Sequence, residues 1–304
     1  MNKNTLLQKI HSIKVFTKGE RRAPHKPLLF LLALGQWQAG KHQVVFGEIE
    51  EPLLELLKAY APPVVSRHQP ELPFWHLQTD GLWEVEGGIS LPRQAGGFPK
   101  VPALRKSMGG FPPEVTGLLE SEPGLVDEIT DILLNDHFPA SLHDDILAAT
   151  GVTSTQVAEA GTVSYTQKRT RDPAFRDSVL RAYEHKCALT GFRAALGGTY
   201  FGCEAAHVMW HAYRGPDRVD NGLCLEPTMH KLFDAGAWAL TDDRRVLVSA
   251  HLTGDDTTIE RLRSYHGKTI REPLGGEPNV APEYIRWHRE ADLGGVFRGP
   301  GLKA

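Results

Sequence analysis

The sequence predicts an α+β protein of two domains, and three observations lead to that prediction. The chain has 304 residues, the length of two ordinary domains. Residues 21–86 show two helical patterns and then two apolar stretches around a turn. Residues 203–236 show the order strand, loop, strand, helix, which folds into a compact ββα unit. We place the domains at residues 1–150 and 169–304, with the small, polar residues 151–168 as a linker.

Two helices and a hairpin are expected in the first domain. In "RRAPHKPLLFLLALGQWQAG" Pro27 suits the first turn of a helix, the leucines form its buried face, and Gly40 suits its end. "EPLLELLKAY" predicts a second helix, and "LPFWHLQ" and "LWEVE" around "TDG" predict a hairpin. This order resembles a winged-helix arrangement, which offers a helix and a wing to DNA. Residues 91–113 are expected to be loop, and residues 115–137 and 141–150 to be acidic amphipathic helices.

The second domain is expected to start with a helix that Asp172 caps, just before Pro173. Strand pieces follow in "GGTYFGCEAAHVMW", and a short helix in "EPTMHKLFDAG" ends at Gly236. "AWAL" and "RRVLVSA" predict two strands joined by a turn, and a closing helix is expected within residues 278–299.

Composition excludes several classes of protein. The longest apolar stretch is far shorter than the roughly 18 residues of a membrane span, and the N-terminus lacks the features of a signal peptide. Three cysteines without a CxxC pair argue against a disulfide framework and against a four-thiolate structural zinc site, although a mixed zinc site stays open. We therefore expect a cytoplasmic protein without a membrane partner or an organic cofactor.

The net charge of −3 hides a polarised layout. Residues 1–30 carry seven Lys and Arg against one acid, residues 114–145 carry nine acids and no Lys or Arg, and residues 165–193 carry seven basic residues against three acids. Such basic patches fit a polyanionic partner, although ordinary solvated faces explain the charge pattern equally well.

Three residues of the predicted ββα unit carry chemistry. His207 stands at a strand end, Asn221 follows 14 residues later in a loop, and His230 follows after nine more on the helix. Asp234 lies one turn beyond His230, on the same helix face. Such a unit can hold one divalent ion between its helix and its hairpin.

These segments resemble the HNH endonuclease family over residues 185–242, through "CALTG", "CEAAHVMWH" and "DNGLCLEPTMHKLFDAG". The resemblance implies a ββα-metal nuclease in which His207 is the general base that activates water. A divalent ion such as Mg²⁺ or Mn²⁺, held by His230 and Asp234, would stabilise charge on the phosphate and the leaving 3′ oxygen. Asn221 would hold the loop and orient the His207 ring through a hydrogen bond.

One position departs from the family pattern. Many members carry a metal-binding Asp or His just before the base, where this chain has Ala206. Water, a substrate oxygen or Glu204 could fill the gap, although Glu204 and His207 would point to opposite faces of an extended strand. His211 completes a superficial match to a zinc-protease motif, but Val208 stands where that motif has glutamate. We expect His211 to contact phosphate or solvent.

The first domain carries a second resemblance. "RRAPHKPLLFLLALG" and "LPFWHLQTDGLWEV" resemble the sulfur-binding domain of McrA-like restriction endonucleases that act on phosphorothioated DNA, over about residues 10–140. In that family an apolar pocket holds the sulfur, which is larger and less hydrated than oxygen and so is desolvated at lower cost. The resemblance implies a pocket of Leu72, Pro73 and His76, with Leu72 where members often carry an aromatic residue. Contacts to the DNA backbone or bases would come from Arg22, His25, Lys26, Arg67 and Arg93.

The sequence therefore predicts a type IV-like restriction endonuclease. Its first domain would recognise phosphorothioated double-stranded DNA, and its second would hydrolyse phosphodiester bonds nearby with a single divalent metal. Two alternatives stay open: an HNH nuclease that reads methylated or unmodified DNA, and a DNA-binding regulator with a vestigial nuclease domain. Ala206 favours the regulator, whereas the intact His207, Asn221 and His230 argue against it. A homodimer also stays open, because nothing in the sequence specifies an interface.

Overall fold

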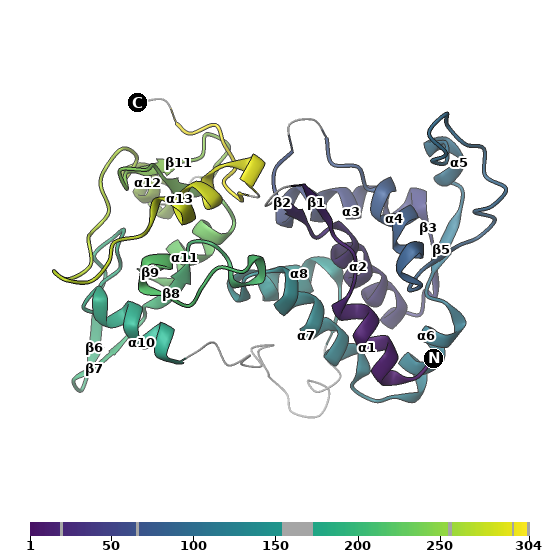
Figure 1. Cartoon of the computed structure of the whole chain (residues 1–304), viewed down its shortest axis with the longest axis horizontal. Coiled ribbons are helices and arrows are strands. Elements are labelled where there is room, and N and C mark those ends of the chain that lie inside the picture. The colour runs from purple at the N-terminus through teal and green to yellow at the C-terminus, as the bar shows by residue number, and fades with distance from the viewer. Residues whose placement is uncertain (19–20, 65–66, 154–172, 255–256, 294, 303–304) are drawn as a thin grey trace. The chain divides into compact units, whose positions relative to one another are not determined.

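The structure, a computed structural model, describes residues 1–18, 21–64, 67–153, 173–254, 257–293 and 295–302. By their contacts these residues form two units, which are described separately (Figure 1). Residues 1–16 and 23–153 belong to the first unit; residues 17–18, 21–22 and those from 173 onward belong to the second. Most of the predicted linker, residues 151–168, and the predicted cap Asp172 lie outside the described residues. The domain boundaries therefore stay a prediction.

The first unit is built mainly from helices. Its helices are α1 (Lys3–His11), α2 (His25–Gln38), α3 (Phe46–Tyr60), α4 (Glu71–His76), α5 (Val101–Leu104), α6 (Pro113–Ser121), α7 (Leu125–His137) and α8 (His143–Thr150), with the 3-10 helices η1 (Leu77–Asp80) and η2 (Ala140–Leu142). Its sheet consists of β3 (Gln43–Val45), β4 (Glu84–Val85) and β5 (Met108–Gly110). In the chain between α1 and α2, β1 (Phe16–Lys18) pairs with β2 (Arg21–Ala23).

Helix α2 forms the centre of this unit. Every residue from Pro27 to Gly35 is buried, because α3, α4, α7 and α8 all contact this helix. A helix that is apolar all round is expected to be buried in this way. A Cβ on Gly35 would lie 2.0 Å from the carbonyl oxygen of Thr150, so this glycine lets the end of α8 approach the α2 backbone. The predicted first helix is confirmed, and Gly40 just beyond it adopts the left-handed conformation with φ 83°.

The sheet of the first unit has the order β3-β5-β4, with antiparallel pairing throughout. Its central strand, β5, lies in the segment that we expected to be loop. A Cβ on Gly109 would lie 2.7 Å from a ring atom of Phe74 and 2.7 Å from one of Trp83. The strand carries glycine because aromatic rings of the core fill the space beside its backbone. Glycine argues against a strand in the sequence alone, so the pattern hid this one.

The predicted hairpin over residues 72–86 is wrong, because "LPFWHLQ" forms α4 and the start of η1. Pro73 lies in the first turn of α4, where no backbone N–H is needed. Phe74 and Leu77, three residues apart, are both fully buried, which is helical spacing and not strand alternation. Gly81 ends η1 with φ 65° and does not turn a hairpin. The winged-helix arrangement, which would use that hairpin as its wing, is not confirmed.

The second unit combines short helices with two-stranded sheets. Its described helices are α10 (Pro173–Ala182), α11 (Pro227–Asp234), α12 (Thr257–Arg263) and α13 (Pro282–Arg289), with the 3-10 helices η3 (His211–Tyr213), η4 (Val219–Asn221) and η5 (Ala291–Leu293). Its strands pair as β6 (Ala194–Leu196) with β7 (Thr199–Phe201), β8 (Glu204–His207) with β9 (Gly222–Leu225), and β10 (Trp238–Leu240) with β11 (Val246–Val248). None of the helices described in either unit has the length and hydrophobicity that a membrane span requires.

The predicted ββα order is confirmed. Strand β8 pairs antiparallel with β9, from Glu204 opposite Leu225 to His207 opposite Gly222, and α11 follows directly (Figure 1). Both strands are backed by α10 and belong to the buried core of the unit. A Cβ on Gly222 would lie 2.4 Å from the Val179 side chain, so glycine lets α10 pack closely behind the end of β8. The predicted strands around Trp238 and Val246 and the predicted closing helix are also confirmed.

A buried histidine joins α13 to α11. The His288 ring stacks on Phe233 with 3.7 Å between ring centroids, and its Nε2–H donates to the Phe233 carbonyl oxygen at 3.1 Å. Burial lowers the pKa of His288 to about 4, although this hydrogen bond and the charge of Asp234 act in the other direction. The ring is therefore neutral in the folded chain at neutral pH.

We expect the second unit to lose stability in mild acid through His288. A histidine with an unfolded pKa near 6.5 and a folded pKa of about 4 contributes stability that is fully present above pH 6.5 and is lost as pH falls through 4. The loss amounts to about 3 kcal/mol. The free energy of unfolding, measured by urea titration between about pH 7 and about pH 4.5, should therefore depend less on pH in His288→Phe than in the wild type. The phenylalanine keeps the stack on Phe233. The exposed His251→Gln serves as the control, and equal slopes for His288→Phe and the wild type would contradict this assignment.

Candidate functional site

His207 ends β8 and is held from two sides. Its ring stacks on Phe175 of α10, with 4.0 Å between ring centroids and 17° between ring planes. Its Nε2 lies 2.7 Å from Oδ1 of Asp217, on the loop between β8 and β9. The side chain is only 9% exposed, so this histidine is positioned by packing and by one carboxylate.

Asn221 organises the loop that carries Asp217. Its buried Oδ1 accepts from the Met209 N–H at 2.8 Å, and its Nδ2 donates to the carbonyl oxygens of Met209 and Pro216, both at 3.0 Å. A Cβ on Gly215 would lie 1.8 Å from the Met209 oxygen, which explains a glycine in this loop. The prediction that Asn221 holds the loop is confirmed. The expected hydrogen bond to the His207 ring is replaced by these bonds to the backbone, because both amide hydrogens are used there.

His230 lies on α11 between two carboxylates. Its Nδ1 is 2.7 Å from Oε2 of Glu204, on β8, and its Nε2 is 3.1 Å from Oδ2 of Asp234, one helical turn later. Burial opposes the charged ring, but the charges and hydrogen bonds of Asp234 and Glu204 outweigh it and raise the pKa of His230 to about 9. The three side chains therefore form one cluster in which a protonated imidazole lies between two carboxylates.

Asp234 is held more tightly than the sequence implied. Only 1% of its side chain is exposed, and its second oxygen, Oδ1, accepts a hydrogen bond from the indole Nε1 of Trp210 at 3.1 Å. Trp210 therefore has two roles. It packs against Tyr213 and Trp287 and also fixes the carboxylate that faces His230. The side chain of Glu204, by contrast, is 46% exposed.

The cluster does not form a closed metal cage. Among the described residues, no three or more His, Cys, Asp or Glu side chains surround one position suited to a metal ion. The ββα unit offers the carboxylates of Glu204, on β8, and Asp234, on α11, to either side of the His230 imidazole. Hard divalent ions are commonly bound by one or two protein groups, with water and substrate phosphate as the other ligands. The donor set therefore fits an open site for such an ion.

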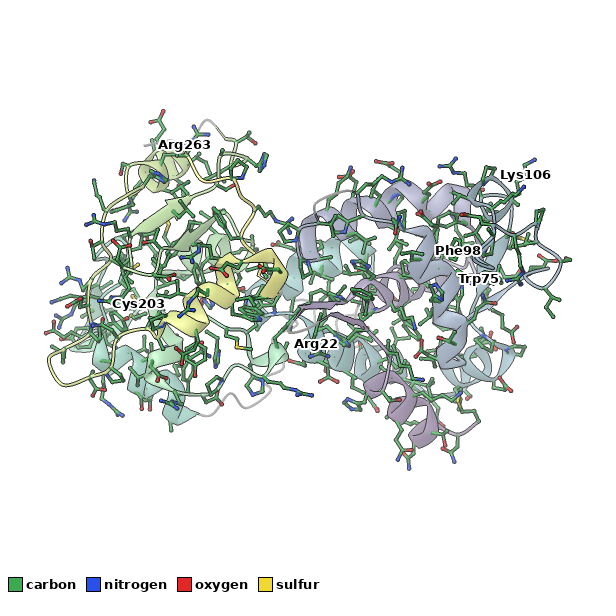
Figure 2. All side chains as sticks on the ribbon, turned by 45° about the horizontal axis from the view of Figure 1, so that its top comes forward. Arg22, Trp75, Phe98, Lys106, Cys203 and Arg263 are labelled. Atoms are coloured by element: carbon green, nitrogen blue, oxygen red, sulfur yellow. The ribbon has the colours of Figure 1, made fainter. Side chains whose placement is uncertain are left out.

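His211 and the three cysteines of the chain lie outside this cluster of His230, Glu204 and Asp234. His211 is exposed on η3, with its ring centroid 6.0 Å from that of His207. Cys187, Cys203 and Cys224 are free and buried, and the Cys203 and Cys224 thiols share a hydrogen bond (Cys203 is labelled in Figure 2). The three thiols thus pack as small buried groups.

Helix α4 brings the three residues of the predicted sulfur pocket together. Pro73 is buried, Leu72 is half-buried, and His76 is exposed near the end of the helix. Although His76 is exposed as a residue, partial desolvation of its ring, and secondarily the charge of Lys26, lower its pKa, so the ring is neutral at neutral pH. Phe98 adds an aromatic wall that the sequence did not suggest: its ring lies 5.8 Å from that of His76 and 6.3 Å from that of Trp75 (Figure 2).

The basic residues predicted to contact DNA differ in their exposure and in their partners. The Lys26 ammonium pairs with Asp80 at 2.5 Å and is only 12% exposed, whereas Arg67 is 61% exposed. Arg93 donates to the carbonyl oxygens of Gly97 and Gly88 and lies over the Trp75 ring, so it stabilises its own loop. His25 is half-buried at the start of α2. Arg22 groups with the second unit, whereas the other residues predicted to bind sulfur or DNA lie in the first.

A cleft of about 780 Å³ opens beside α4. Trp75 and Arg93 line it together with Gln78, Glu84 and Met108. Leu72, Pro73 and His76 do not line it, so the predicted sulfur pocket and this cleft are separate features, although Trp75 of the cleft belongs to the same helix, α4.

The family model of the ScoMcrA-like DNA sulfur-binding domain matches residues 3–155, which is half of the chain. The chain belongs to the ScoMcrA-like sulfur-binding family. A second model, the HNH endonuclease, matches residues 187–241, the segment that holds the ββα unit. Both resemblances expected from the sequence are thereby confirmed, and the fold of the first unit matches the sulfur-binding family, whereas the winged-helix description is not confirmed.

Several solved structures are similar to this chain. The sulfur-binding domain of ScoMcrA complexed with phosphorothioated DNA is 23% identical, with a TM-score of 0.42, over 48% of this chain and 94% of that one. The sulfur-binding domain of SprMcrA, also with phosphorothioated DNA, is 21% identical, with a TM-score of 0.41, over 50% and 94%. The type IV phosphorothioation-dependent restriction endonuclease ScoMcrA is 22% identical, with a TM-score of 0.39, over 48% of this chain and 32% of that one. No curated protein matches the chain.

Proposed function

We propose that this chain is a DNA endonuclease whose first unit binds a phosphorothioate and whose second unit hydrolyses a phosphodiester bond nearby. One observation carries the proposal. A single chain joins the sulfur-binding family sequence to an HNH unit in which His207 ends a strand and His230 stands on the helix behind it. Restriction of modified DNA is the role that follows from this pairing. The cytoplasmic location and the homodimer stay predictions.

His207 is suited to act as the general base. An imidazole titrates near neutral pH and can take a proton from water at the pH at which such enzymes work. Phe175 and Asp217 fix its ring, which reduces the entropy that is lost on reaching the reactive arrangement. Asn221 contributes by holding the loop, and the exposed His211 is placed to contact a neighbouring phosphate.

Glu204 and His230 are the groups that would hold a divalent ion. Such an ion supplies positive charge that stabilises the phosphate and the leaving 3′ oxygen. The His230 nitrogen that faces Glu204 is Nδ1, and Glu204 is the more exposed of the two carboxylates. Asp234, buried against Trp210, serves the site by orienting His230 through Nε2, as carboxylates behind metal-binding histidines commonly do.

The sulfur pocket is placed on the part of α4 that carries Leu72 and His76. Leu72 presents carbon surface and His76 a neutral ring beside the buried Pro73, and Phe98 extends that surface. Sulfur is larger, more polarisable and less hydrated than oxygen, so such a surface discriminates in its favour. Contacts to the phosphates or the base edges are proposed for five basic residues: Arg67, His25, Lys26, Arg93 and Arg22.

His207→Ala should abolish cleavage and leave DNA binding intact. General-base catalysis contributes about 10²- to 10⁴-fold, and the substitution removes the base without touching the first unit. The measurement is single-turnover cleavage of a phosphorothioated duplex, with affinity for that duplex measured in parallel. His251→Ala, an exposed histidine of the same unit, is the control. Cleavage at the wild-type rate by His207→Ala would remove this residue from the catalytic role.

Glu204→Gln should weaken binding of Mn²⁺ by about tenfold. A divalent ion at this site must displace a proton from His230, whose pKa is about 9. Titration calorimetry of the full chain with Mn²⁺ alone, in two buffers of different ionisation enthalpy, should therefore also show proton release near neutral pH. Glu283→Gln, on the exposed start of α13, is the matched control. Unchanged Mn²⁺ affinity in Glu204→Gln would exclude this ligand assignment.

The chain should bind phosphorothioated DNA at least about tenfold more tightly than plain DNA of the same sequence at the same salt concentration. The comparison uses the full chain with His207→Ala, so that cleavage does not interfere. His76→Ala should reduce the preference, because it removes one wall of the pocket, whereas the exposed His42→Ala should leave it unchanged. Equal affinity for the two duplexes would favour the alternative that this nuclease reads another mark or none.

A further inference from the structure

Asp217 faces the proposed base, and no family motif singled it out. It lies ten residues after His207, in the loop sequence "RGPDR". Its Oδ1 is 2.7 Å from Nε2 of His207, and its side chain is 28% exposed. A carboxylate at this distance from a largely buried ring nitrogen makes a charge-assisted hydrogen bond.

That hydrogen bond selects the tautomer of His207. A carboxylate can only accept, so Nε2 must carry the hydrogen and donate it. In the neutral ring the lone pair is then on Nδ1. The Phe175 ring, stacked 4.0 Å away at 17°, prevents the imidazole from turning over. The nitrogen that can take a proton is therefore fixed by Asp217 and Phe175 together.

Asp217 is itself positioned by the buried amide of Asn221. Nδ2 of Asn221 donates to the carbonyl oxygen of Pro216, the residue immediately before Asp217. The backbone N–H of Arg218 donates to the same oxygen, and the N–H of Asn221 donates to the carbonyl of Arg218. A tight turn thus holds Asp217 from both sides. Asn221 acts on His207 through this turn.

We propose that Asp217 is a positioning residue for His207 in the hydrolysis assigned to this unit, and this proposal rests on that proposed function. Asp217 keeps the Nε2–H tautomer, so that Nδ1 takes a proton from water. The water oxygen forms the new bond to phosphorus, and the bond from phosphorus to the 3′ oxygen breaks with its electron pair on that oxygen. The imidazolium formed is stabilised by the Asp217 carboxylate, while the Nε2 hydrogen stays on the ring.

The test uses three variants of the full chain. Asp217→Asn keeps the size of the side chain, removes its charge and can donate to Nε2, which favours the wrong tautomer. Asp217→Glu restores the carboxylate. Asp220→Asn is the matched control, because Asp220 is in the same turn but pairs with Arg218 at 2.6 Å.

Two measurements separate positioning from folding. Cleavage of a phosphorothioated duplex should show kcat reduced by about 10- to 100-fold in Asp217→Asn, with KM within about twofold of wild type. Asp217→Glu should recover most of the rate, and Asp220→Asn should keep it. NMR of chains labelled with ¹⁵N-histidine, with the His207 signals identified by their loss in His207→Ala, should show Nε2–H in the wild type and a mixed or reversed tautomer in Asp217→Asn.

Either measurement can overturn the proposal. If His207 keeps the same tautomer in Asp217→Asn, or is not an Nε2–H tautomer in the wild type, Asp217 does not position the base. A kcat in Asp217→Asn equal to that of the wild type would overturn it as well. If the wild-type chain cuts no DNA, the proposed function fails, and the NMR result still decides whether Asp217 fixes the ring.

Discussion

The buried amide of Asn221 is the interaction on which the rest of the candidate active site depends. It closes the loop between β8 and β9 by bonding to the backbone of Met209 and Pro216. The strand end that carries His207 and the turn that carries Asp217 are both set by this closure. An amide suits the task because it donates and accepts at once, and a buried carboxylate or alkyl chain would leave carbonyl or N–H groups unsatisfied. The Asn221 side chain thus holds this loop closed by hydrogen bonds, whereas other small loops are often held by a metal ion or a disulfide.

The sequence predicted the ββα unit well, because the unit is short-range. Strand, loop and helix follow one another within the 31 residues from Glu204 to Asp234, so the intervals among His207, Asn221 and His230 reflect the fold directly. The contacts that refine the site were not predictable in this way. Asp217 reaches His207 across an irregular turn, and Trp210 reaches Asp234 from a 3-10 segment. Neither contact follows a period of 2 or 3.6 residues, so no pattern in the sequence indicates it.

The first unit shows the opposite case, in which tertiary packing overrides local signals. Leu72 to Leu77 alternate well enough to suggest a strand, yet Pro73 in a first turn favours a helix, and the rings of Phe74 and Trp83 complete the core. Those same rings displace any side chain from Gly109, so the central strand looks like loop in the sequence. Family resemblance found the right fold here, because it depends on the whole set of residues and not on the preference of each one.

The raised pKa of His230 has a consequence for how the nuclease unit is maintained in its resting state. Two acidic side chains brought together in a folded core normally need a cation to offset their repulsion. Here a single proton on the ring between Glu204 and Asp234 plays that part at neutral pH. The proton thus offsets part of the repulsion between these two carboxylates within the folded unit. A divalent ion bound by Glu204 and His230, as proposed, would have to displace this proton, so its affinity would fall as the pH is lowered.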